Sequence, residues 1–252
     1  MKILITGASS GLGLSFARLL AEPSNELFLV SRNKERLLKV QEELKGRTKV
    51  NVITADLSDY EKVKGVYVAL KNEEINFLIN NAGIGTYGEF IGTDINRELM
   101  MLDVNVKAVH ALTKLFLKDM ADRNEGTILN VTSIAGFFPG PLMTSYYAGK
   151  AYITSLSLGI YEELRRSKSK VKIAVLAPGP IKTEFDKEAG ISKPLKGMDP
   201  EKVASYALKK LKQNKLIIIP GSLYRFNRFM IRLIPTKLLL KISYKLQNKK
   251  RK

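Results

Sequence analysis

Short apolar runs alternate along the chain with longer segments in which apolar residues recur every three or four positions. Continuous apolar runs are typical of strands buried on both faces, and the periodic segments are typical of amphipathic helices. The runs that predict strands are residues 2–6, 26–31, 50–55, 76–80, 127–133, 172–177 and 216–219. This alternation predicts an α/β fold in which about seven strands form one parallel sheet.

Helices and loops fill the intervals between these strands. The clearest helical patterns cover residues 13–22, 33–46 and 154–167. Asp199 is followed by Pro200 and Glu201, which predicts an N-cap, a proline at the first helical position and an acid near the positive end of a helix. Residues 139–144 and 186–198 are rich in Gly, Pro and Lys, and we expect loops there that can contact a substrate.

Positive charge is concentrated near the C-terminus. The chain has 252 residues and a formal net charge of +18, but no Asp or Glu follows Glu201, and fifteen Lys and Arg lie beyond that point. The first 201 residues therefore carry only +3. Because there is no internal repeat or long linker, we expect one domain over residues 1–222 and a basic tail over residues 223–252.

The tail has the periodicity of two basic amphipathic helices separated at Pro235. The repeated cations are Arg225, Arg228 and Arg232 before the proline and Lys237, Lys241 and Lys245 after it. Such helices can lie on an anionic membrane with their apolar side chains inserted. Alternatively, the apolar face covers a substrate pocket or packs on a second copy of the chain. Nucleic acid is less favoured as a partner because no reading module is recognisable.

Composition disfavours several kinds of site. The chain contains no cysteine, which excludes disulfides and thiolate metal sites, and its single histidine, His110, argues against a His-based metal site. No apolar run reaches the roughly 18 to 20 residues of a membrane-spanning helix. The N-terminal residues lack the features of a secretory signal, so we expect a cytoplasmic protein whose membrane association, if any, is through the tail.

A glycine-rich turn, TGASSGLG at 6–13, directly follows the first expected strand. Gly7, Gly11 and Gly13 permit a tight turn, and free N–H groups at a helix start can hold an anionic pyrophosphate. The spacing differs from the G-x-G-x-x-G dinucleotide fingerprint. Such a turn can be a plain connection between strand and helix, but its position at the first strand–helix junction favours nucleotide binding.

Two neighbouring tyrosines, Tyr146 and Tyr147, precede Lys150. Helix positions four apart lie about 40° apart on one face, whereas positions three apart are displaced to its other side but still allow contact. Helical geometry therefore favours Tyr146 as the partner of Lys150 without excluding Tyr147. A nearby ammonium lowers the pKa of a phenol, ordinarily about 10, toward the range useful in acid–base catalysis.

Taken in order, these motifs resemble the short-chain dehydrogenase/reductase family. The glycine turn has the family pattern T-G-x-x-x-G-x-G, and the further matches are AsnAsnAlaGly at 80–83, Asn105, Ser133, Tyr146 with Lys150, and Pro178–Gly179 followed by Thr183. The resemblance implies a doubly wound Rossmann fold. It also implies an oxidoreductase that interconverts carbonyls and alcohols with NAD(P), assembled as a homodimer or homotetramer.

The resemblance further implies roles for single residues. Tyr146 would act as general acid/base, and Ser133 would hydrogen-bond the substrate oxygen. Lys150 would bind the nicotinamide ribose, and Asn105 would position a water beside it. The pattern Y-x-x-x-K selects Tyr146 and leaves Tyr147 as a packing or interface residue. The implied cofactor contacts are, besides Tyr146 and Lys150, Gly7, Ser9, Ser10, Gly11, Leu12, Gly13, Arg32, Asp56, Leu57, Asn81, Ala82, Gly83, Pro178, Gly179, Ile181 and Thr183.

Arg32 bears on the choice of cofactor. The second expected strand ends in Ser31, Arg32 and Asn33, where an acid that binds the ribose 2′-hydroxyl of NAD would stand. A guanidinium suits a 2′-phosphate, so NADP(H) is favoured over NAD(H). Against this, Ser9 and Ser10 stand where NADP-using relatives often carry a second basic residue. Arg32 can also be a solvated loop charge.

Asp56, after the third expected strand, has two interpretations. The resemblance places it, with Leu57, against the adenine ring. It can equally cap the following helix, a role for which Ser58 and Asp59 also compete.

The motifs together predict an NADP(H)-dependent oxidoreductase that uses Tyr146 as acid/base and acts on an apolar carbonyl or alcohol. The alternative is a nonenzymatic NADP-sensing module that its basic tail tethers to membrane or nucleic acid.

Overall fold

The computed structural model describes residues 1–251 and places seven strands of that range in one sheet. The strands are β1 (Lys2–Thr6), β2 (Glu26–Ser31), β3 (Lys49–Thr54), β4 (Phe77–Asn80), β5 (Thr127–Val131), β6 (Lys172–Leu176) and β7 (Ile217–Ile218). Neighbouring strands are parallel throughout, in the order β3-β2-β1-β4-β5-β6-β7. The expected seven-stranded parallel sheet is confirmed.

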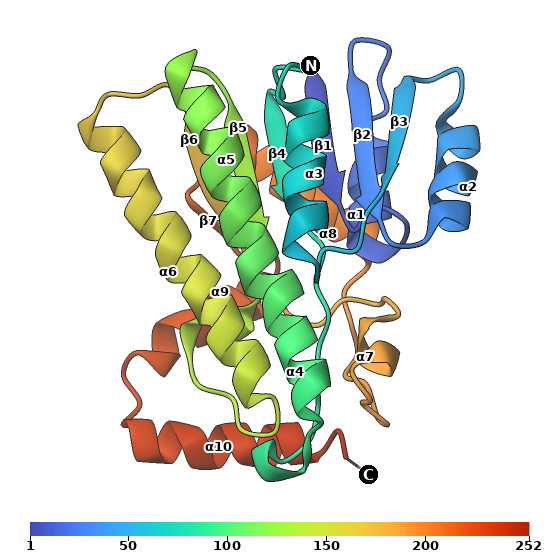
Figure 1. Ribbon diagram of the computed structural model, residues 1–252. Helices are drawn as coiled ribbons and strands as arrows, with labels where there is room; N and C mark the ends of the chain where they lie inside the picture. Colours follow the sequence, from blue (N-terminus) through green and yellow to red (C-terminus); the bar gives the residue numbers. More distant parts are fainter. Residues whose placement is uncertain (252) are drawn as a thin grey trace.

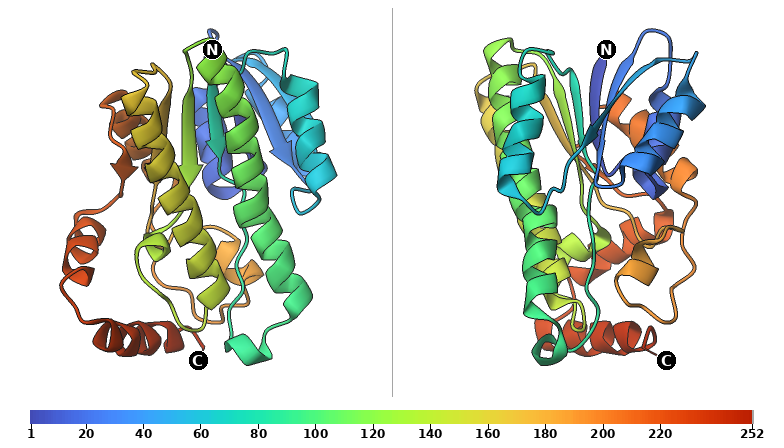
Figure 2. Two further views of the ribbon diagram at one scale, coloured as in Figure 1. Left: turned by 60° about the vertical axis from the view of Figure 1, so that its left-hand side comes forward. Right: turned by 45° about the vertical axis from the view of Figure 1, so that its right-hand side comes forward.

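Helices cover both faces of this sheet (Figures 1 and 2). One layer contains α1 (Gly11–Leu20), α2 (Lys34–Leu44) and α8 (Pro200–Lys212), and the other contains α3 (Tyr60–Leu70), α5 (Val109–Asp122) and α6 (Thr144–Arg166). Phe16 of α1 and Phe116 of α5 are buried in the two opposite cores. Burying such a side chain contributes roughly 1.5–3 kcal/mol. The fold is the expected doubly wound α/β arrangement.

Short capping motifs fix where the helices begin. Asp199 caps α8 by accepting a hydrogen bond from the backbone N–H of Lys202 at 3.0 Å, as the sequence predicts. Asp59 caps α3 in the same way. Asp56 therefore does not cap that helix, and its Oδ1 instead accepts hydrogen bonds from the backbone N–H and hydroxyl of Ser58.

The strand order reverses at β1, because the chain runs outward to β3 and then returns to pair β4 with the other side of β1. In such sheets ligands bind in the crevice at the carboxyl ends of the strands. Segments beyond this edge include η1 (Phe90–Gly92), α4 (Ile95–Leu102), the π-helical η2 (Asp103–Ala108), η3 (Ile134–Phe137) and α7 (Phe185–Glu188). The loop expected at 186–198 is thus wrong in its first residues, which complete α7.

The tail forms α9 (Ser222–Ile231) and α10 (Thr236–Asn248), with Pro235 directly before α10. The two expected helices and the break between them are confirmed. In Figures 1 and 2, α10 lies across the end of the molecule toward which the strands run. None of the helices between residues 1 and 251 combines the length and hydropathy needed to traverse a bilayer.

Candidate active site

One cavity of about 840 Å³ follows the carboxyl edge of the sheet, from the glycine-rich turn after β1 to α10. This volume lies in the upper part of the usual range for cofactor and ligand sites. Every predicted site residue except Gly13 and Asn105 lines the cavity. The structure therefore brings the predicted residues together, and the role of each one stays a prediction.

The glycine-rich turn packs tightly against the loop that follows β4. Gly7 has a φ of +66°, a conformation that favours glycine. A Cβ on Gly13 would lie 2.2 Å from the carbonyl oxygen of Gly7, so Gly13 supports the turn from behind. Asn81 Nδ2 donates to the carbonyl oxygens of Thr6 at 3.0 Å and Gly7 at 3.2 Å. These contacts fix the turn at the start of α1.

The start of α1 suits an anion. Ser10 occupies the N-cap position without a side-chain capping hydrogen bond, and the first turn of this helix contains no acidic residue. The first amides of any helix lack partners within the helix and carry partial positive charge. Because Ser10, Gly11 and Leu12 line the cavity, these groups fit the pyrophosphate of a nicotinamide dinucleotide.

Two arginines lie at the cavity end next to β2. Arg32 is exposed and lines the cavity. Arg36, one turn into α2, also lines it and forms a bidentate ion pair with Glu184, with N–O distances of 2.6 and 3.3 Å. The hydroxyls of Ser9 and Ser31 are hydrogen-bonded at 2.8 Å. Arg36 is absent from the predicted contacts, although its spacing of four residues from Arg32 is a signal that could have identified it.

Asp56 and Leu57 line the cavity near these arginines. Burial acts to raise the pKa of Asp56, but hydrogen bonds from Ser58 and the charge of Arg32 hold it below its usual value. Asp56 is therefore ionised at neutral pH and can accept hydrogen bonds from a ligand.

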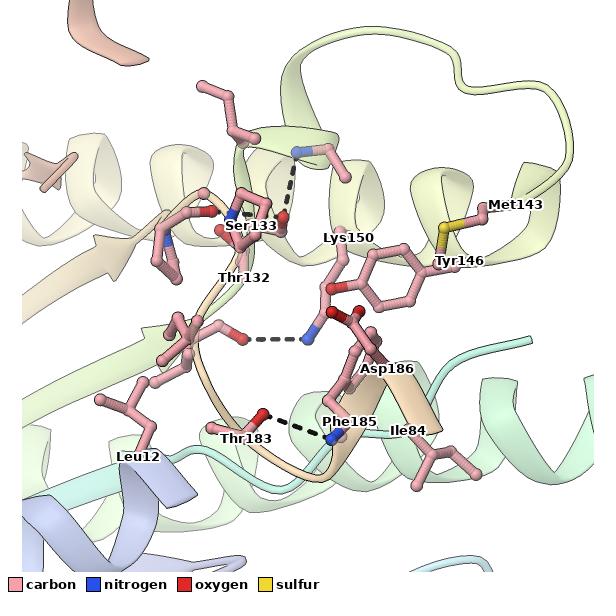
Figure 3. Close-up of a pocket in the computed structure, with 18 of the residues that line it drawn as sticks. Leu12, Ile84, Thr132, Ser133, Met143, Tyr146, Lys150, Thr183, Phe185 and Asp186 are labelled. Atoms are coloured by element: carbon pink, nitrogen blue, oxygen red, sulfur yellow. Dashed lines mark hydrogen bonds between the residues drawn. The ribbon is translucent and has the colours of Figure 1, made fainter. Parts of the chain in front are cut away.

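Tyr146 and Lys150 lie one turn apart on α6, and both are buried. The Lys150 Nζ lies 5.7 Å from the centre of the Tyr146 ring and donates to the carbonyl oxygen of Val131 at 3.1 Å. Figure 3 shows the Tyr146 hydroxyl and the Lys150 ammonium pointing into the same space. Tyr147 instead contacts α10, because its hydroxyl accepts a hydrogen bond from Gln247 Nε2.

Burial controls the protonation of this pair. It raises the pKa of Tyr146 above its ordinary value, and a hydrogen bond with Ser133 offsets this only in part. It also lowers the pKa of Lys150 to about 8. The expected lowering of the Tyr146 pKa is therefore wrong for the chain by itself, because a low-dielectric site disfavours the phenolate. Tyr146 is protonated at neutral pH and able to donate its proton.

Asn105 is placed behind the cavity, on the π-helical segment η2. Its Nδ2 donates to the carbonyl oxygen of Ile84 at 2.7 Å, and its Oδ1 accepts from the Ile84 N–H at 2.9 Å. A Cβ on Gly83 would lie 3.2 Å from Asn105 Oδ1 and 3.4 Å from Lys150 Nζ. Asn105 therefore holds the chain after β4 close to Lys150.

Ser133 connects the end of β5 to the loop after β6, since its Oγ donates to the carbonyl oxygen of Pro178 at 3.4 Å. The predicted residues of that loop line the same stretch of cavity: Pro178, Gly179, Ile181 and Thr183. Two neighbours that the sequence analysis missed also contribute. The Phe185 ring lies 5.4 Å from the Tyr146 ring, and burial raises the pKa of Asp186. Figure 3 shows the Asp186 carboxylate beside Tyr146.

The far end of the cavity is formed by the tail. The lining residues that belong to α10 are Leu239, Ile242, Ser243, Leu246 and Gln247, and Lys250 follows shortly after the end of this helix. Tyr224 of α9 packs on Gly179, where a Cβ would lie 2.4 Å from its ring. The sequence leaves open whether the tail lies on a membrane, covers the pocket or packs on a second copy of the chain. The structure shows that it covers the pocket. The sequence predicts these helices but not which side chains turn inward.

Comparisons with known proteins agree with this geometry. The model of the short chain dehydrogenase family matches residues 1–193. The very-long-chain 3-oxoacyl-CoA reductase of Anas platyrhynchos is 34% identical over 198 residues, which are 76% of this chain and 62% of that protein. The chain spans only 60 to 62% of the length of the first such reductases that it matches.

Two solved structures are also similar. A short-chain dehydrogenase from Sphingobium yanoikuyae in complex with NADPH has a TM-score of 0.83 and 29% identity, over 90% of this chain and 91% of that one. The bulky-bulky ketone specific alcohol dehydrogenase from Comamonas testosteroni has a TM-score of 0.78 and 27% identity, over 93 and 94% of the two chains. Fold, site geometry and the match to the family model together show that the chain belongs to the short-chain dehydrogenase/reductase family of oxidoreductases, which act on carbonyl and alcohol groups with NAD(P).

Proposed function

We propose that the protein interconverts a carbonyl group and a secondary alcohol with NADP(H), and that Tyr146 is its general acid/base. The observation that carries this proposal is the buried Tyr146–Lys150 pair, with Ser133 close by, in a cavity that continues to the start of α1. If Tyr146 and Lys150 had only a structural role, they would not need to line a cavity that also reaches the proposed pyrophosphate site.

Tyr146, Ser133 and Lys150 each have a distinct role in the proposed reaction. When bound, the reduced nicotinamide supplies a hydride to the carbonyl carbon of the substrate. Tyr146 donates its phenolic proton to the carbonyl oxygen, and the Ser133 hydroxyl hydrogen-bonds the same oxygen. The charge of Lys150 stabilises the phenolate left on Tyr146. In the reverse direction, that phenolate accepts the proton of the alcohol.

A preference for NADP(H) follows from the cations beside β2. Arg32 lines the cavity where an acid would repel a 2′-phosphate, and Arg36, in the first turn of α2, lines it as well. Because Arg36 is already paired with Glu184, Arg32 is the residue that we propose binds the phosphate. The Sphingobium yanoikuyae relative was solved in complex with NADPH, which is consistent with a preference for NADP(H).

An apolar substrate is supported by the lining beyond Tyr146. The side chains there include Phe138, Met143, Leu239 and Leu246. Relatives are named for very-long-chain 3-oxoacyl-CoA and for bulky ketones, and substrates of that kind fit this lining. We therefore propose an aliphatic or bulky ketone rather than a small polar hydroxy acid.

A screen of ketones with both cofactors tests this function. We expect NADPH to be consumed with one or more apolar ketones, and NADH to be consumed more slowly. If neither cofactor is consumed with any ketone and no alcohol is oxidised, the nonenzymatic sensor becomes the better account.

We also propose that the outer side of the tail lies on an anionic membrane. In α9, Arg225 donates to Tyr206 and Arg228 stacks 4.6 Å from the Phe137 ring, so these two cations face the protein. The apolar side chains are exposed instead: Phe226 and Phe229 are 60 and 62% exposed. Exposed cations follow at Arg232, Lys237, Lys241 and Lys245.

Apolar side chains beside cations suit the boundary between acyl chains and anionic head groups. A substrate dissolved in the membrane would then be delivered to the side of α10 that covers the cavity. The homodimer or homotetramer implied by the family also remains a proposal, with the exposed Ile95 and Leu99 of α4 as candidate contacts.

A further inference from the structure

Two polar residues of α10 face the cavity at its far end. Ser243 and Gln247 lie one helical turn apart, are only 3 and 6% exposed, and line the cavity. Neither Ser243 Oγ nor Gln247 Oε1 has a hydrogen-bond partner among residues 1–251. Leaving a buried polar atom unpaired costs on the order of 1–3 kcal/mol.

The unpaired serine is unusual within this chain. Buried helical serines normally donate back to the carbonyl four residues earlier, as Ser15 does to Gly11 at 3.1 Å and Ser157 to Ile153 at 2.7 Å. Ser243 makes no such bond to Leu239 within the described chain. Its hydroxyl is therefore not committed to its own helix.

Gln247 is held in place from two sides. Its Nε2 donates to the Tyr147 hydroxyl, and its backbone carbonyl oxygen accepts a hydrogen bond from the Tyr87 hydroxyl at 2.8 Å. The ring of Tyr147 in turn lies 6.1 Å from that of Tyr146. These contacts connect the unpaired amide oxygen to the catalytic tyrosine through a single side chain.

We propose that Ser243 and Gln247 bind a hydroxyl group that the substrate carries at a distance from its reacting carbonyl. The inference rests on the proposed function and specifies its substrate as a largely apolar ketone with a second, neutral polar group. A hydroxyl donates one hydrogen bond and accepts others, so it satisfies both the amide oxygen and the serine hydroxyl.

The amide can also be turned by 180°, so that Tyr147 donates to Oε1 and Nε2 becomes the unpaired atom. A hydroxyl satisfies this arrangement equally. A carboxylate would meet the acceptor oxygen of Gln247 and the carboxylate of Asp186, which lines the same cavity. An anion would depend instead on Lys250, whose pKa is lowered by burial.

The experiment compares ketones of one chain length that carry a methyl, hydroxymethyl or carboxylate group on one carbon remote from the carbonyl. The position of that carbon is varied along the chain. We measure kcat/KM with NADPH on the full chain. At one position the wild type should prefer the hydroxyl ketone to the methyl ketone by about tenfold. Gln247→Leu and Ser243→Ala should reduce this preference severalfold, mainly through KM.

Asn248→Leu is the matched control, because Asn248 is the next residue of α10 and lies outside the described lining of the cavity. It should keep the preference. Equal kcat/KM values for the hydroxyl and methyl ketones at every position would overturn the subsite. A preference for the hydroxyl ketone that persists in Gln247→Leu would overturn it too. The subsite would also be overturned if the wild type preferred the carboxylate ketone and Lys250→Met lost that preference.

A second readout separates this inference from the proposed function. The hydroxyl ketone should raise the Tm of the wild type with NADP⁺ more than the methyl ketone does, and Gln247→Leu should remove the difference. If no ketone is turned over, the proposed function fails, while the Tm comparison still decides the subsite. Equal Tm shifts for the two ketones at every position would then overturn it.

Discussion

The Lys150 ammonium nitrogen lies 5.7 Å from the centre of the Tyr146 ring, and both side chains are at least nine-tenths buried. This arrangement keeps a cation next to a phenol that burial holds in its protonated form. Tyr146 is therefore ready to donate a proton, and the phenolate that results has its counter-ion one helical turn away.

The rate of carbonyl reduction should depend on pH through Lys150. Because burial lowers the pKa of Lys150 to about 8, its charge is present below that pH and lost above it. We expect kcat/KM for reduction to fall as the pH rises through about 8. Lys150→Arg keeps its charge to much higher pH, so the kcat/KM of this variant should not fall as the pH rises through about 8. An identical fall in that variant would assign the titration to another group.

Lys150 should also lower the stability of the free chain. The unfolded chain holds this proton up to about pH 10.5 and the folded chain only up to about 8, so the penalty is complete below pH 8 and disappears as the pH rises to 10.5. Lys150→Met should be more stable at pH 7 by about 1–3 kcal/mol, reduced by the lost bond to Val131, and should gain less than about 1 kcal/mol at pH 10.

Urea unfolding at the two pH values measures this difference. Lys114→Met, on the exposed side of α5, should change stability by less than about 0.5 kcal/mol. A Lys150→Met chain less stable than the wild type at pH 7 would show that the hydrogen bond to Val131 outweighs the desolvation penalty.

Local signals explain how much of this site the sequence predicts. The glycine turn, the cap at Asp199 and the spacing of Tyr146 and Lys150 depend on residues close together in the chain, and the structure has each feature where the pattern indicates it. The family match adds the order of the motifs. The parallel sheet and its doubly wound arrangement follow from these two sources, as do the predicted site residues, all of which except Gly13 and Asn105 line the cavity.

The remainder depends on contacts between distant segments. The amphipathic pattern groups Arg228 with the repeated cations of the tail, yet its side chain stacks on Phe137, which lies 91 positions earlier. The pKa of Tyr146 depends on burial, to which Phe185 of α7 contributes by packing on its ring, and no pattern around residue 146 reveals that contact. Similarly, Gln247 meets Tyr147 only because α10 crosses the cavity.

Substitution of Arg32 should change the cofactor preference. Arg32→Ala removes the charge proposed to bind the 2′-phosphate, so KM for NADPH should rise about 10- to 100-fold while KM for NADH changes little. Lys34→Ala is the matched control, since Lys34 is exposed and lies outside the described lining of the cavity. Equal effects of Arg32→Ala on both cofactors would contradict the NADP assignment.

Vesicle sedimentation tests the membrane surface. The full chain should bind vesicles containing phosphatidylserine more strongly than neutral vesicles, and less strongly at high salt. Phe226→Ser combined with Phe229→Ser should weaken binding roughly tenfold or more, because two exposed rings no longer insert. Tyr161→Ser, an exposed aromatic of α6, should leave binding unchanged. If the double variant instead dissociates a dimer, this face is a contact between copies of the chain.

The most direct measurement is the rate of ketone-dependent NADPH oxidation by Tyr146→Phe. We predict a loss of about 10²–10⁴-fold in kcat with NADPH binding retained. Tyr152→Phe, on the same helix as Tyr146, should keep near wild-type turnover, because the exposed hydroxyl of Tyr152 is hydrogen-bonded to His110 of α5. Wild-type turnover by Tyr146→Phe would contradict the account.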